Sequence, residues 1–187
     1  METKTSRPDF ELRDPEGSLL SEYLDFCRET WGHVHDSYIL HDPAKFEEWR
    51  GTIFRQYRDA AEGIGLPPGF VPSVTWWIIK DGRIVAVGNL RPKLSDRLRE
   101  YGGHLGLAIR PSDRGKGWSK PIALLMMGKA REFGIEELLL TCEADNPASV
   151  RLCESLPDAR HESAEATVGG RSCRILRTWV DLTGGRN

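Results

Sequence analysis

Apolar residues recur at helical spacing in the first third of the chain. Those in residues 17–30 fall on one face of a predicted helix. A second helix is predicted over 43–62, because Asp42 precedes Pro43 as a capping acid before a first-turn proline. The glycines and prolines of residues 63–70 then predict a loop.

The pattern changes after this loop to runs of β-branched and aromatic residues. Residues 74–80 and 83–90 predict two strands. The Asp81-Gly82 pair between them is typical of a two-residue hairpin turn. A short polar helix near 93–100 is expected to follow the hairpin.

Strands and helices alternate in the rest of the chain. A strand over 104–110, an amphipathic helix over 120–133 and a strand over 137–142 predict a right-handed, parallel strand–helix–strand crossover. The last predicted elements are a helix over 146–156 and strands near 162–168 and 172–182. This order favours an α/β fold with a mixed sheet flanked by helices.

Composition limits the classes of function. The 187 residues favour a single domain over 1–187, and a net charge of −2 with interspersed acids and bases predicts no nucleic-acid partner. No apolar run approaches the ~20 residues of a membrane helix, and the polar N-terminus lacks the apolar segment of a secretion signal. We therefore expect a cytoplasmic protein without a membrane partner.

Cysteine and histidine spacing does not indicate a metal site. The four cysteines form no C-x-x-C pair and match no zinc motif; they are Cys27, Cys142, Cys153 and Cys173. Three histidines near the predicted N-terminal helices lack accompanying thiol or carboxylate spacing; they are His33, His35 and His41. Free thiols and no metal are the expectation.

The most informative segment is Arg114-Gly115-Lys116-Gly117-Trp118-Ser119, between a predicted strand and a predicted helix. Backbone amides at a helix start lack intrahelical acceptors, and the helix dipole favours an anion there. By itself the loop is also compatible with an ordinary strand-to-helix turn. A Walker-type nucleotide loop is excluded, because no Gly-Lys-Ser/Thr sequence occurs.

Together with its flanks, the loop resembles the diphosphate loop of the GNAT superfamily of acyl-CoA N-acyltransferases, Arg/Gln-x-x-Gly-x-Gly/Ala. Ser119 stands in the last small position. Residues 109–113 resemble the family's lead-in from its fourth strand, and residues 146–156 resemble its asparagine-led helix. The neighbourhoods 71–76 and 102–106 resemble a bacterial branch of predicted acetyltransferases.

This resemblance implies a GNAT fold with three parts. Residues 1–70 would form N-terminal helices, residues 71–160 the acyl-CoA-binding core, and residues 161–187 the C-terminal strands. The family often dimerises, so a homodimer is a further expectation. The resemblance is strong over roughly 70–160 and looser before it.

The resemblance also implies the residues that bind CoA. The pyrophosphate would contact the loop and the helix start, namely Arg114, Gly115, Lys116, Gly117, Trp118, Ser119 and Lys120. The pantetheine arm would follow the strand at Leu107, Ala108 and Ile109, with Asn146 and Ser149 completing the site. Side-chain parity adds that the strand face with Gly106 and Ala108 is nearly bare, which predicts close approach of a ligand to that face.

Acyl transfer to an amine requires a base and a proton donor. Removing a proton from an amine of pKa ~10.4 at pH 7 costs about 4.6 kcal/mol. His104 is the first candidate base by location, Glu143 the second and Glu100 the third. The family's tyrosine acid is replaced by Cys153, so that Cys153 or water would protonate the leaving thiolate.

Each of these residues also has a structural interpretation. His104 would be a buried histidine bonded to the backbone, Glu143 a solvated residue at a strand end, and Cys153 a small core residue. The resemblance predicts an acetyl-CoA-dependent N-acetyltransferase acting on a primary amine of a small molecule or peptide. The missing tyrosine motivates an alternative, a non-catalytic acyl-CoA sensor or interaction domain. A transferase using another donor, such as succinyl-CoA, is a third interpretation.

Overall fold

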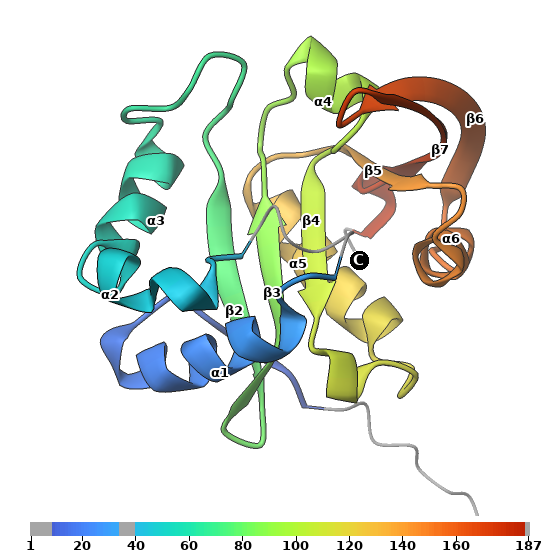
Figure 1. The fold of residues 1–187 in the computed structure, drawn as a ribbon. Helices are drawn as coiled ribbons and strands as arrows, with labels where there is room; N and C mark the ends of the chain where they lie inside the picture. The colour runs from blue at the N-terminus through green and yellow to red at the C-terminus, as the bar shows by residue number, and fades with distance from the viewer. Residues whose placement is uncertain (1–8, 34–39, 186–187) are drawn as a thin grey trace, which may run out of the picture.

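A computed structural model describes residues 9–33 and 40–185 of the chain (Figure 1). His35 and the first eight residues, which bear on the metal and secretion-signal expectations, lie outside the described residues. Three helical segments follow the first short strand. They are α1 (Leu20–Thr30), α2 (Phe46–Trp49) and α3 (Ile53–Glu62), with 3-10 turns at Gly17–Leu19 and Pro43–Lys45.

The helix predicted over 43–62 is interrupted between α2 and α3. Gly51 lies at the break, where glycine costs about 1 kcal/mol relative to alanine in a helix. The break lets Trp49 and Ile53 reach the same core, where both are buried. The capping predicted for Asp42 is confirmed, since its carboxylate accepts a hydrogen bond from the Ala44 amide at 2.9 Å.

The first sheet has four antiparallel strands in the order β1-β2-β3-β4. They are β1 (Glu11–Arg13), β2 (Val74–Lys80), β3 (Arg83–Leu90) and β4 (Leu105–Ile109). The predicted hairpin turn is confirmed, because Asp81 and Gly82 both have positive φ, +52° and +76°. Strand β1 is too short to show a periodic pattern and was not predicted.

The second sheet has the order β5-β7-β6 and is also antiparallel. Its strands are β5 (Glu137–Glu143), β6 (Ala159–Val168) and β7 (Arg171–Asp181). The α/β class with helices flanking strands is therefore confirmed. The structure differs from the expected crossover in one respect, since β4 and β5 belong to different sheets and form no ladder with each other.

Side chains explain why β4 and β5 separate. The Leu139 amide donates to His104 Nδ1 at 2.9 Å, and the Gly102 amide donates to Thr141 Oγ1 at 2.8 Å. These bonds occupy polar groups that a parallel ladder would otherwise use. One backbone bond, from His104 to the Leu139 carbonyl at 2.8 Å, joins the segments at this point.

Helices cover both faces of the first sheet (Figure 1). Helix α1 and its neighbours pack on the face that presents Trp77, Val87 and Ala108. Helix α5 (Ser119–Glu132) passes behind β3 and β4 and packs on the other face, where Met126 lies against Gly88. Short helix α4 (Asp96–Glu100) precedes β4 in the chain, and α6 (Pro147–Glu154) follows β5 and contacts it. Within the described residues, no helix is long and apolar enough to cross a bilayer.

Candidate active site

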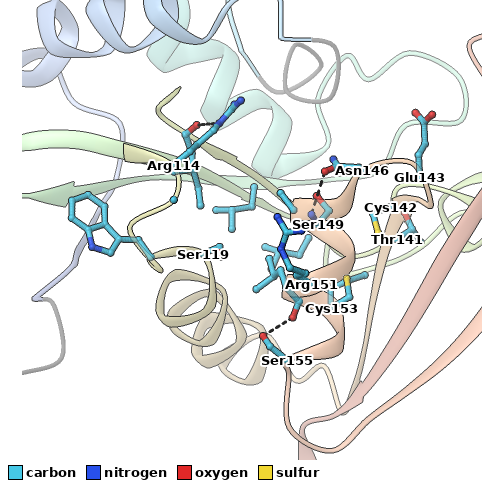
Figure 2. Close-up of a pocket in the computed structure, with 18 of the residues that line it drawn as sticks. Arg114, Ser119, Thr141, Cys142, Glu143, Asn146, Ser149, Arg151, Cys153 and Ser155 are labelled. Atoms are coloured by element: carbon cyan, nitrogen blue, oxygen red, sulfur yellow. Dashed lines mark hydrogen bonds between the residues drawn. The ribbon is translucent and has the colours of Figure 1, made fainter. Parts of the chain in front are cut away.

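The separation of β4 from β5 accompanies a cavity of about 630 Å³ (Figure 2). Most of the lining residues come from β4, the loop before α5, β5 and helix α6, and His33 and Tyr101 line the cavity as well. Its wall on the β5 side includes Leu140, Thr141, Cys142 and Glu143. Figure 2 shows Asn146, Ser149 and Cys153 entering the same region from the segment that forms α6.

One wall of the cavity is the open edge of strand β4. The Arg110 amide donates to the Val85 carbonyl of β3 at 2.9 Å. Because bonded pairs alternate along an antiparallel ladder, the even-numbered residues of β4 bond to β3. The odd-numbered residues therefore turn their N–H and C=O groups toward the open edge; they are Leu105, Leu107 and Ile109.

The loop before α5 presents a second set of backbone donors. Gly115 and Gly117 both have φ of +76°, and a Cβ at either would meet nothing within 4 Å. Within the described part of the chain, the amides of Gly115, Gly117, Trp118 and Ser119 donate no hydrogen bond to protein. These donors lie at the start of a 14-residue helix, where an anion is favoured.

Cations surround this loop, but two of them have protein partners. Lys116 Nζ bonds to Asp113 Oδ1 at 2.7 Å and lies 4.8 Å from the centre of the Trp118 ring. Arg114 Nε donates to the Ile109 carbonyl at 3.1 Å, which places its guanidinium beside the β4 edge. Lys120 is exposed. The loop thus combines backbone donors with positive charge.

The wall opposite β4 begins at Asn146. Its side-chain oxygen accepts a hydrogen bond from the Ser149 amide at 3.2 Å and caps α6. Pro147 occupies the first turn, where a missing N–H costs nothing. The cap fixes the start of α6 and thereby the positions of Ser149 and Arg151 in the cavity wall.

Two thiols contribute to the cavity wall. Cys142 comes from β5 and Cys153 from α6. The neighbouring Cys142 thiol lowers the pKa of Cys153, whereas the pKa of Cys142 is raised by Cys153 and by burial.

Glu143 lies at the end of β5 with its side chain only 7% exposed. Its Oε2 accepts a hydrogen bond at 2.8 Å from Arg171, the first residue of β7. A second, open depression of about 480 Å³ adjoins it and also contains Arg171 and Cys173. Glu143 is thus a buried carboxylate that pairs with Arg171 and belongs to the cavity-lining residues.

His104 lies at the junction of the two sheets, and it is not among the cavity-lining residues. Its Nδ1 accepts a hydrogen bond from the Leu139 amide, so the ring proton resides on Nε2 when the ring is neutral. Burial, with Arg99 and Arg91 nearby, lowers the pKa of His104 to about 4. The ring is therefore neutral at pH 7 and bonded to backbone.

The structure brings most of the predicted site residues together. Those that line the cavity are Leu107, Ile109, Arg114, Gly115, Gly117, Trp118, Ser119, Glu143, Asn146, Ser149 and Cys153. Ala108, Lys116, Lys120 and His104 are not among the lining residues. Glu100, the third candidate base, is not among them either, although its neighbour Tyr101 is.

The inference from the bare face of β4 was wrong. Ala108 is fully buried beside Trp77 and Tyr23, because small residues on this face let α1 pack closely. Arg110, on the same face, is paired with Glu22 and Glu29 of α1. The opposite face, with Leu105, Leu107 and Ile109, lines the cavity.

Several lining residues were not predicted, among them Tyr101, Leu105, Thr141, Cys142, Arg151 and Leu152. Tyr101 could have been found, because it directly precedes the Gly102-Gly103 turn into β4. Gly103 has φ of +60°, and a Cβ there would lie 2.4 Å from the Leu139 carbonyl oxygen. Only glycine fits this close approach of the two sheets.

Comparisons with known proteins agree with this architecture. A family model described as the acetyltransferase (GNAT) family matches residues 18–156. No match to a curated protein sequence was found.

Three solved structures with similar folds are distant from this chain in sequence. A ribosomal-protein alpha-N-acetyltransferase in complex with coenzyme A is 15% identical, with a TM-score of 0.61 over 94% of this chain and 95% of that one. A spermidine N-acetyltransferase chimera from Vibrio cholerae and hSSAT is 14% identical, with a TM-score of 0.60 over 93% of this chain and 96% of that one. An acetyltransferase from Salmonella typhimurium with its cofactor acetyl-CoA is 12% identical, with a TM-score of 0.55 over 95% and 96%.

Proposed function

Since the chain belongs to the acetyltransferase (GNAT) family and is thus an acyltransferase, we propose that it transfers an acetyl group from acetyl-CoA directly to a primary amine. The observation that carries the proposal is a cavity bounded by an open strand edge and by a helix start with unused amides. Solved structures with this fold contain acetyl-CoA or CoA. The acceptor is a small molecule or a peptide.

The loop before α5 binds the pyrophosphate of the donor. Amides of Gly115, Gly117, Trp118 and Ser119 supply hydrogen-bond donors without the desolvation cost of a buried charge. The exposed Lys120 adds positive charge at the helix start, and Arg151 adds it from the α6 wall. Lys116 acts indirectly, because it is bonded to Asp113.

The pantetheine arm lies along the open edge of β4. The arm contains two amides, which can pair with strand N–H and C=O groups as a peptide would. Leu107 offers both groups and Ile109 its N–H, because the Ile109 carbonyl accepts a hydrogen bond from Arg114, and the apolar side chains beside them cover the methylene carbons. Asn146 and Ser149 face the arm from the opposite wall.

Two residues handle protons in this proposal. Glu143 attracts the ammonium form of the acceptor and takes its proton, directly or through a water molecule. Cys153 protonates the CoA thiolate as it leaves, because its sulfur lies in the wall between β5 and α6. His104 is assigned a positioning role at the sheet junction instead of the base role, since its Nδ1 is engaged and burial lowers its pKa to about 4.

The acceptor class rests on chemistry and on the relatives. The named relatives act on spermidine and on an alpha-amine of a protein, and both are primary amines. Attack of the neutral amine on the thioester carbonyl forms the amide bond, and the C–S bond breaks. The homodimer expected from the family is a separate proposal that sedimentation velocity tests.

The test is calorimetry of CoA and acetyl-CoA binding to protein freed of bound CoA. Exchange of both Gly115 and Gly117 for valine should weaken binding at least 100-fold, because valine tolerates positive φ poorly and would project into the cradle. Gly134→Ala is the matched control, since Gly134 also has positive φ (+74°) with open space and is not among the cavity-lining residues. Unchanged affinity for CoA in the double variant would exclude the loop before α5 as the pyrophosphate-binding site.

A screen of amines for release of free CoA then separates the candidate functions. Turnover with acetyl-CoA supports the transferase, and the preferred acceptor defines the substrate. Tight binding without turnover for any acceptor would favour the sensor, which the cysteine at position 153 motivates. Turnover only with a longer acyl-CoA would replace the proposed donor.

A further inference from the structure

Asp113 is a buried carboxylate at the entrance to the loop before α5. It ends the 3-10 turn at Pro111–Asp113, belongs to the cavity-lining residues and has a side chain that is only 1% exposed. Its Oδ2 accepts a hydrogen bond from Arg83 Nη1 of β3 at 2.9 Å, and its Oδ1 accepts one from Lys116 Nζ at 2.7 Å. Burying a carboxylate is costly unless it is paired in this way. The fold thus keeps a negative charge beside a loop that we propose binds an anion.

The bond between Asp113 and Lys116 spans the first glycine of the loop. Gly115 and Gly117 both have positive φ, and a Cβ at either would meet nothing within 4 Å, so contacts elsewhere must hold the loop in place. Lys116 supplies them, because its Nζ bonds to Asp113 and lies 4.8 Å from the centre of the Trp118 ring. These three side chains form one continuous set of contacts across both glycines.

The turn that carries Asp113 is itself tied to helix α1 and strand β3. The Ser112 amide donates to Glu29 Oε1 of α1 at 2.6 Å, and the Ser112 hydroxyl accepts a hydrogen bond from Arg83 Nη2 at 2.8 Å. Arg110, which precedes the turn, also pairs with Glu29, at 3.3 Å. Asp113 is therefore fixed relative to the first sheet, and the part of the loop that it holds is fixed with it.

We propose that Asp113 is a positioning residue for the acyl donor, which orients the loop amides toward the pyrophosphate by holding Lys116 in place. This role rests on the proposed function of the loop. Ordering a loop that contains glycine costs conformational entropy, because glycine has more backbone freedom than other residues. A loop that is already ordered in the free protein does not lose this free energy when the donor binds.

The charge of Asp113 by itself would act in the opposite direction, because a carboxylate repels an anion nearby. Replacement by asparagine separates the two effects. Asparagine has nearly the same shape, but it is neutral and one end of its amide is a donor, so it cannot accept hydrogen bonds from two cations as the carboxylate does. Loss of the charge alone would strengthen anion binding, whereas loss of the positioning contacts would weaken it.

The first test is calorimetry of CoA, ADP and pantetheine binding to wild type and Asp113→Asn. We expect the variant to bind CoA and ADP at least tenfold more weakly and to bind millimolar pantetheine as wild type does, because pantetheine has no pyrophosphate. Asp25→Asn is the matched control, since it breaks an exposed pair with Arg28, also three residues away, on α1. Equal or tighter CoA binding by Asp113→Asn, or an equal loss for all three ligands, would overturn the positioning role.

The second test approaches Asp113 from its partner on β3. Arg83→Gln removes the ion pair with Asp113 and the bond to Ser112, and Arg83 is not among the cavity-lining residues. The Arg83 side chain is partly exposed, so this variant should fold even where Asp113→Asn does not. We expect CoA and ADP to bind at least threefold more weakly and pantetheine to bind as in wild type. Unchanged CoA affinity in folded Arg83→Gln protein would refute the proposal.

The third test is steady-state kinetics with an acceptor found in the amine screen. Asp113→Asn should raise the KM for acetyl-CoA at least tenfold and leave kcat and the KM for the acceptor close to wild type. A fall in kcat with an unchanged KM for acetyl-CoA would contradict positioning of the donor. Wild-type protein that binds no CoA would contradict the proposed function, whereas normal CoA binding by both wild type and Asp113→Asn would contradict the positioning role alone.

Discussion

His104 shows how one side chain can support the site without lining the cavity. Its ring accepts the Leu139 amide, and its own amide donates to the Leu139 carbonyl. An acceptor at this place is required, because an unpaired buried amide costs about 1–3 kcal/mol. The position beside the cofactor strand suggested a base, whereas the bond to Leu139 depends on how the two sheets meet and is not visible in the sequence.

The pH dependence of stability should reveal this role. Burial lowers the pKa of His104 to about 4 from its ordinary 6.5, so the unfolded chain binds the proton more tightly. The contribution of His104 to the free energy of unfolding is complete above pH 6.5. It is lost as pH falls toward 4, by on the order of 3 kcal/mol.

Denaturant unfolding of wild type and His104→Asn at pH 7.5, 6, 5 and 4 measures this effect. The asparagine oxygen can still accept the Leu139 amide but does not titrate, so the variant should show a smaller loss of stability on acidification. His104→Leu is the comparison, because it leaves the amide without an acceptor and should be less stable at pH 7.5. Parallel pH profiles for wild type and His104→Asn would rule out titration of this ring.

At the scale of an element, strand β4 likewise contains groups that hold the fold together and groups that face the cavity. Its even-numbered residues bond to β3, and its odd-numbered residues turn their peptide groups to the cavity. Proline lacks the N–H group, so its effect should depend on which edge it modifies.

Leu107→Pro and Ala108→Pro separate the two edges. The first removes an N–H at the open edge, and the protein should fold while binding CoA at least tenfold more weakly. The second removes an N–H that bonds to β3 and leaves a β3 carbonyl without its partner, which should cost about 1–3 kcal/mol of stability. Thermal unfolding and calorimetry measure the two effects, and similar losses of stability in both variants would contradict the assigned bonding pattern.

Elements with strong local patterns were predictable, and those defined by long-range contacts were not. The hairpin at Asp81-Gly82, α5 and the cap at Asn146 follow from local turn chemistry and periodicity. The helix breaks at Gly51 because Trp49 and Ile53 both pack into a core with Tyr23, which lies much earlier in the chain. Separation of β4 from β5 depends on side-chain bonds at His104 and Thr141, which strand periodicity does not encode.

At the scale of the whole molecule, the ligand would bridge two separate sheets. The first sheet contributes β4, and the loop before α5 follows that strand. The second sheet contributes β5, and helix α6 follows it. A molecule that contacts both should stabilise them together, because binding to the folded state alone adds free energy of unfolding.

Saturation with CoA should therefore stabilise the protein globally. At a CoA concentration 100 times its Kd the gain is about 2.7 kcal/mol. Amide hydrogen exchange should slow in both β4 and α6. ADP is the control ligand, because it lacks the pantetheine arm and should protect the loop at 114–119 alone. Protection by CoA confined to that loop would contradict the bridging geometry.

The open edge of β4 has a further consequence for the protein without its ligand. The peptide groups of Leu105 and Leu107 and the Ile109 N–H on this edge form a template for any extended chain, including a strand from another copy of the protein. Depletion of CoA should thus favour slow self-association on storage, with fibrillar or amorphous particles seeded at this edge. Adding CoA during purification would then act as a solubilising agent, because the pantetheine amides satisfy the groups that would otherwise recruit a second chain.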